Sequence, residues 1–137
     1  MDKQVEEIIV RTFFNKRVQD RILFELSSKT KRTMAIGRLS HNYLDVLKNQ
    51  YMTELYKPNS NFNDIAALLR EEGAGNICYV ISYNYNIDGI YLPLLTALEE
   101  AVGFGMPSLI SCIPNKLLYL ECEQVFGPPP RYILKKD

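Results

Sequence analysis

The spacing of apolar residues near the start of the chain predicts an amphipathic helix over residues 2–14. Val5, Ile8, Ile9 and Phe13 recur at intervals that place them on one helical face, and Asp2 stands where a capping side chain is favoured.

The next segment has a pattern that two structures can satisfy. Ile22, Phe24 and Leu26 alternate with Leu23 and Glu25, and the polar stretch "SSKTKRT" follows them. This alternation predicts a β-hairpin over residues 16–39. A continued helix through Val18, Ile22 and Leu26 is the alternative, because these residues are four positions apart.

The remaining chain alternates helical and extended patterns. We expect a short helix in "HNYLDVLKNQY", helices over 62–72 and 92–102, and strands over 77–82, 108–113, 117–123 and "RYIL". Apolar periodicity assigns six residues to the core: Leu68, Leu69, Ile81, Leu95, Leu98 and Ile110.

These elements together predict a single α+β domain spanning residues 1–137, with a mixed β-sheet and helices packed on it. The strand–helix–strand unit between residues 77 and 113 favours parallel pairing of its two strands, whereas the terminal strands favour antiparallel pairing.

Composition narrows the class of protein. The chain has 137 residues, of which 47% are hydrophobic and 23% charged, as in globular domains. No apolar run approaches the roughly 18 residues needed to span a bilayer. The first ten residues contain acidic side chains where a secretory signal requires basic ones, so we expect a cytoplasmic protein.

The three cysteines, Cys78, Cys112 and Cys122, form an odd set without Cys-x-x-Cys spacing. We therefore expect reduced thiols, no disulfide and no structural metal, and nothing in the sequence indicates a cofactor.

Charge is balanced overall but unevenly distributed. From Arg11 to Arg38 there are eight basic residues and two acidic ones, whereas from Leu39 to Gly127 there are four basic and ten acidic ones. This asymmetry serves either a charged partner or mutual neutralisation of the two regions within the fold.

Motifs of catalysis are weak. "GFGMPS" follows a helix instead of opening one and lacks the third glycine of a phosphate-binding loop. His41 is the only histidine, and no serine lies in a Gly-x-Ser-x-Gly turn. Glu121 and Glu123 would share one face of a strand, roughly 7 Å apart. A small hydrolase using Glu121, Glu123 or His41 is therefore an alternative, and an enzyme is disfavoured.

The sequence instead predicts a non-enzymatic protein-interaction domain that binds a basic partner. Acidic and tyrosine side chains steer and anchor such partners. An immunity-type protein that masks a basic toxin or nuclease is a concrete member of this class. The predicted contact residues are Tyr83, Tyr85, Asp88, Tyr91, Glu121 and Glu123.

A nucleic-acid-associated protein using the basic region 11–38 is the second alternative. Nucleic-acid binding favours aromatic side chains between the basic ones, but Phe13, Phe14 and Phe24 follow the core pattern here.

Overall fold

A computed structural model describes residues 1–56 and 61–137. The helices are α1 (Lys3–Phe13), α2 (Lys16–Ser27), α3 (Arg32–His41), α4 (Tyr43–Val46), α5 (Phe62–Glu71) and α6 (Leu94–Ala101), with a 3-10 turn, η1, at Asn49–Tyr51. The strands are β1 (Met52–Glu54), β2 (Ile77–Ser82), β3 (Tyr91–Pro93), β4 (Ser108–Ile113), β5 (Leu117–Glu121) and β6 (Arg131–Lys135).

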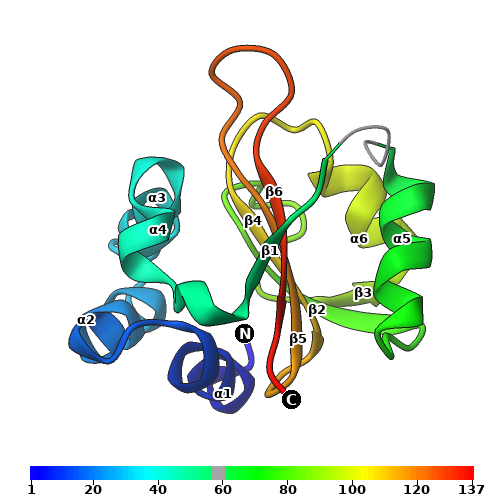
Figure 1. Cartoon of the computed structure of the whole chain (residues 1–137). Helices are drawn as coiled ribbons and strands as arrows, with labels where there is room; N and C mark the ends of the chain where they lie inside the picture. Colours follow the sequence, from blue (N-terminus) through cyan, green and yellow to red (C-terminus); the bar gives the residue numbers. More distant parts are fainter. Residues whose placement is uncertain (57–60) are drawn as a thin grey trace.

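The described strands form one antiparallel sheet in the order β1-β6-β5-β4-β2-β3. Helices α1–α4 cover one face of the sheet and α5 and α6 cover the other, so that the sheet is seen nearly edge-on between two helical layers (Figure 1). This arrangement confirms the α+β class. No helix in the described part of the chain is long and apolar enough to cross a membrane.

Both faces of the sheet contribute to a core because its central strands alternate between them. In β5, Leu118 and Leu120 pack with α1–α4, whereas Leu117 and Tyr119 pack with α5 and α6. The near-continuous apolar sequence of β5 follows from this burial on two sides. Of the six predicted core residues, Leu69, Ile81, Leu98 and Ile110 are buried.

Two core predictions differ from the structure. Leu68 is only partly buried against the core, and Leu95 is 39% exposed, so its assignment to the core was wrong. In α6 the buried positions are Leu94, Ala97, Leu98 and Ala101, a stripe in which small alanines allow the helix to approach the sheet closely. Leu95 lies just outside this stripe.

The predicted hairpin over residues 16–39 was wrong, because α2 and α3 occupy this segment. Ile22 and Leu26, one helical turn apart, are buried against Ala35 and Ile36 of α3, while Phe24 points outward. The helical alternative agrees with the structure up to Ser27, where α2 ends and a short turn reverses the chain.

The predicted parallel pairing, and with it the mixed sheet, was also wrong. After β2 the chain turns at Gly89 and returns along it as the edge strand β3. The Leu94 N–H then donates to the Asn76 carbonyl at 2.8 Å, so α6 starts beside the beginning of β2. The helix therefore brings β4 into the sheet from the opposite end, antiparallel to β2.

Candidate interaction surface

Three loops lie side by side at one end of the sheet. They are residues 83–90 after β2, 102–107 before β4 and 122–130 between β5 and β6. The Tyr83 N–H donates to the Pro107 carbonyl and the Gln124 N–H donates to the Gly105 carbonyl, each at 3.0 Å. The 102–107 loop is thus hydrogen-bonded to both of its neighbours. The 122–130 loop projects beyond the end of the sheet (Figure 1).

Exposed aromatic side chains concentrate on these loops. Tyr83 is 40% exposed, Tyr85 85%, Phe104 46% and Phe126 92%, and Val125 beside Phe126 is also exposed. We call these five residues the aromatic loop surface. Tyr83 and Tyr85 were predicted as contact residues, whereas Phe104, Val125 and Phe126 were not. Phe104 and Phe126 do stand beside glycine and close to proline in the sequence, which is a recognisable sign of a large apolar residue in a loop.

Several carboxylates lie on the strand and helix that run to this end of the sheet. Glu54 ends β1, Glu99 and Glu100 lie in the last turn of α6, and all three side chains are exposed. Glu123, in the projecting loop, has a partly buried carboxylate 3.4 Å from Nε2 of the exposed His41. The aromatic loop surface therefore has several exposed acidic neighbours.

Glu121, a predicted contact residue, is fully buried and unavailable to a partner. It accepts hydrogen bonds from Arg131 Nε at 2.8 Å, from the Tyr119 hydroxyl and from the Gly103 N–H at 2.9 Å. Burial, followed by the nearby Glu121 charge, raises the pKa of Tyr119, so this hydroxyl remains a proton donor. Glu121 thereby fixes the 102–107 loop to the sheet.

Asp88 is also held inside the protein. It accepts from Arg32 Nε at 2.6 Å and from the Ser82 N–H at 3.0 Å, while the same guanidinium donates to both oxygens of Glu6. Burial opposes the charge on Arg32, but its hydrogen bonds to Glu6 and Asp88 outweigh that effect and raise its pKa. The network ties the 83–90 loop to α1 and α3, and it positions Tyr83 and Tyr85 indirectly.

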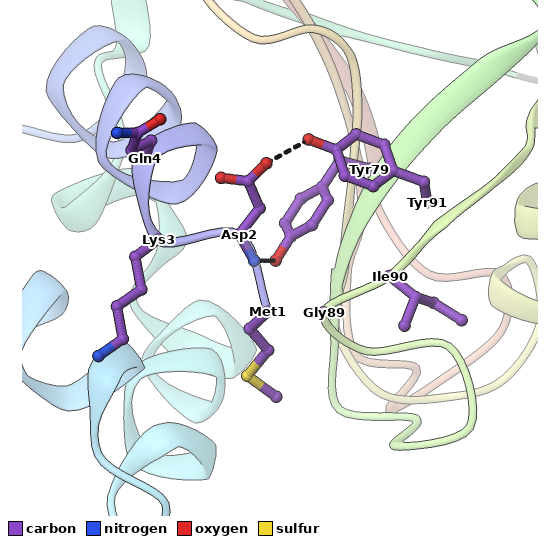
Figure 2. A pocket seen from close by; sticks show the side chains of 8 residues that line it. All are labelled: Met1, Asp2, Lys3, Gln4, Tyr79, Gly89, Ile90 and Tyr91. Atoms are coloured by element: carbon purple, nitrogen blue, oxygen red, sulfur yellow. Dashed lines mark hydrogen bonds between the residues drawn. The ribbon is translucent and has the colours of Figure 1, made fainter.

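Tyr91 is exposed but belongs to a different place, a shallow hollow of about 610 Å³ beside the start of α1. Figure 2 shows its hydroxyl directed at Asp2, to which it donates at 2.6 Å, while the Asp2 N–H donates to the Tyr79 hydroxyl at 3.0 Å. Asp2 also accepts from the Val5 N–H as the cap of α1, and Tyr79 donates to Glu6.

Asp2, Tyr79 and Tyr91 in this hollow are therefore hydrogen-bonded to one another or to α1. The Tyr91 hydrogen bond is the main reason that the pKa of Asp2 lies below its ordinary value, which keeps this capping carboxylate charged. The hollow is thus explained by the capping of α1 and its attachment to the edge strand.

The groups proposed for a hydrolase are not assembled into a catalytic arrangement. Both oxygens of the Glu121 carboxylate accept hydrogen bonds from Arg131. Among the described residues, no hydroxyl or thiol is hydrogen-bonded to His41. Across residues 1–56 and 61–137, no three His, Cys, Asp or Glu side chains are grouped so as to hold a metal ion. Cys78, Cys112 and Cys122 are all free thiols.

Comparisons of this chain with protein-family models, with curated proteins and with solved structures found no match.

Proposed function

We propose that this chain is a non-enzymatic protein-interaction domain that binds a basic protein partner through the aromatic loop surface. The observation that carries the proposal is the gathering of Tyr83, Tyr85, Phe104 and Phe126 on three hydrogen-bonded loops at one end of the sheet. Aromatic side chains are enriched at protein interfaces because they bury a large area with few rotatable bonds.

The size of the surface fits the centre of an interface. A fully exposed aromatic side chain buries about 150–250 Å², so the four partly exposed rings offer roughly 500 Å². A standard interface buries about 800 Å² on each partner. The aromatic loop surface would therefore supply the apolar centre, and the polar groups around it would supply the rim.

The loops are also held in place before a partner arrives. Glu121 bonds to the Gly103 N–H, and Arg32 holds Asp88 at the base of the 83–90 loop. Three consecutive prolines, residues 128–130, restrict the projecting loop. A preorganised surface loses less conformational entropy on binding, which favours affinity.

The sign of the neighbouring charge selects the partner. Glu54, Glu99 and Glu100 are exposed around the aromatic centre, and such carboxylates accelerate association with a basic protein and disfavour an acidic one. An immunity-type protein that masks a basic toxin or nuclease belongs to this class, and the proposal includes it as the most specific form.

The test is cross-linked affinity capture from the source cell, followed by measurement of binding to the partner so identified. A Tyr85→Ala/Phe126→Ala double variant should weaken binding by at least roughly 30-fold, the effect of losing about 2 kcal/mol at a hot spot. Phe24→Ala is the matched control, since Phe24 is also an exposed aromatic residue but lies on α2.

Charge is tested separately. Glu99→Lys/Glu100→Lys should slow association with little change in dissociation, because exposed charges at a rim act mainly on the on-rate. Unchanged affinity of the double aromatic variant would overturn the proposal. Turnover of a small substrate by the purified protein, abolished by His41→Ala, would favour the hydrolase instead.

A further inference from the structure

The outward face of α2 combines basic side chains with an exposed aromatic ring. Arg17, Arg21 and Phe24 are spaced by four and three residues, so they share one face of the helix, and all three are exposed. Lys16 precedes them, and Lys29 and Lys31 follow in the turn before α3. We call these six residues the basic strip.

Phe24 is 61% exposed, contrary to its sequence assignment to the core pattern. Its ring has Lys31 Nζ 5.1 Å from its centre, and Arg21 precedes Phe24 by three residues on the same face of α2. An aromatic ring among cations was the feature missing from the sequence-based case for nucleic-acid binding.

The cations of the strip form no close ion pair within the part of the chain that the structure describes. Among the described residues, none of its five basic side chains lies within 4.0 Å of a carboxylate oxygen. The acidic residues of α2 are engaged elsewhere, since Asp20 contacts Arg11 at 3.1 Å and Glu25 accepts two hydrogen bonds from Arg38. Ion pairs within the fold therefore neutralise part of the excess positive charge of residues 11–38. The basic side chains of this region without such an ion pair to a described residue are those of the strip.

Two of these cations lie where a helix dipole disfavours positive charge. Lys16 and Arg17 occupy the first turn of α2, which contains no acidic residue, although the positive end of the helix dipole disfavours cations there. The Asn15 side chain does not cap the helix and instead donates to the carbonyls of Asp45 and Leu47. The Arg17 guanidinium likewise donates to the Asp45 carbonyl, at 2.8 Å, so this cation is also held beside α4.

We infer that the basic strip binds single-stranded nucleic acid, with Phe24 stacking on a base and Arg17, Arg21 and Lys31 contacting the flanking phosphates. Single-strand binding sites combine a basic track with aromatic stacking surfaces, and this combination separates them from sites that recognise acidic proteins by charge alone. The strip lies on α2 and the turn that follows it, and it shares no residue with the aromatic loop surface, so this inference does not depend on the proposed function.

The test is fluorescence polarisation with labelled oligodeoxythymidine and oligouridine over a series of salt concentrations. Binding should weaken as the salt concentration rises. If all five cations contact phosphate, the logarithm of the binding constant should fall with the logarithm of the salt concentration with a slope of about −3.5, and fewer contacts give a shallower slope. Arg21→Gln should make the slope shallower by about 0.7. Phe24→Ala should weaken binding by roughly 5- to 150-fold without changing the slope.

The controls are Phe126→Ala and Lys116→Gln, which remove an exposed aromatic and an exposed cation outside the strip and should leave oligonucleotide binding unchanged. The DNA and RNA arms identify the preferred strand chemistry. Absence of binding at low salt, or binding that Phe24→Ala and Arg21→Gln leave unchanged, would overturn the inference. So would a preference for vesicles of anionic phospholipid with no binding to either oligonucleotide.

Discussion

Replacing Arg32 with methionine should destabilise the protein by about 3–5 kcal/mol, because removal of one partner leaves buried charge uncompensated. Four hydrogen bonds of 2.6–2.9 Å join this guanidinium to Glu6 and Asp88, and a fifth reaches the Leu26 carbonyl at 3.0 Å. The three charged side chains are at most 10% exposed, so water cannot replace the lost guanidinium. Against a typical total stability of about 5–15 kcal/mol, this loss is large.

Urea unfolding at pH 7 measures the effect. With a slope of about 2 kcal/mol per molar urea, the midpoint should fall by roughly 2 M. Lys135→Met is the matched control, since Lys135 lies equally close to Glu72, at 2.7 Å, but the pair is exposed and its loss should not move the midpoint measurably.

A triple variant separates the charge effect from lost packing. Adding Glu6→Gln and Asp88→Asn to Arg32→Met removes the stranded carboxylates and should restore most of the lost stability. If Arg32→Met shifts the midpoint no more than Lys135→Met does, the network does not hold the helical layer to the sheet. If the triple variant is no more stable than the single one, the loss comes from packing.

Three further predictions concern ionisation and backbone conformation. Hydrogen bonds from Arg38 hold the pKa of Glu25 below its ordinary 4.5, so the Glu25 carboxylate stabilises the fold above pH 4.5 and this contribution is lost as the pH falls through the folded-state pKa. When stability is measured against decreasing pH, its loss should be shallower for Glu25→Gln than for the unmodified protein. Identical curves would contradict this. Burial raises the pKa of all three thiols to about 12. Alkylation at pH 8, monitored by mass spectrometry, should therefore be at least roughly a thousandfold slower in the native protein than in the unfolded protein. Comparable rates in the two states would show that the thiolates are exposed. Gly89 and Gly103 both have positive φ, but only at Gly89 would an added Cβ overlap a neighbouring side chain, that of Met1. Gly89→Ala should therefore lower the thermal midpoint more than Gly103→Ala, and the reverse order would refute the steric argument.

The sequence predicted most elements whose burial follows a regular period. Helix α5 and strand β2 were located within a residue or two because their apolar residues repeat at 3.6 positions or form a continuous run. Residues 16–39 were ambiguous, since Ile22 and Leu26 fit both a strand face and a helical turn, and only packing against Ile36 decides between them. Strand β3 escaped prediction because three residues carry no measurable period, and its presence reverses the direction of β4.

The candidate site was less predictable than the fold, because the environment of a charge depends on distant residues. Nothing near Asp88 in the sequence reveals that Arg32, 56 positions away, will neutralise it, and Glu121 gives no sign of its burial beside Arg131. Tyr83 and Tyr85 are exposed, as a contact role requires, because a loop after a buried strand places side chains outside the core. Whether they contact a partner stays a prediction.

The short strands at the margins of the sheet bear on aggregation. The central strands "SLISCI" and "LLYLE" are apolar, uncharged except for one glutamate, and rich in residues that favour cross-β assembly. They are flanked on one side by β6 and then β1 and on the other by β2 and then β3, and β1 and β3 are only three residues long. Pro93, which has no N–H to donate, further limits strand addition at β3. A second molecule therefore finds few backbone groups to pair with on the native sheet, and self-association through strands requires the outer layers to open first.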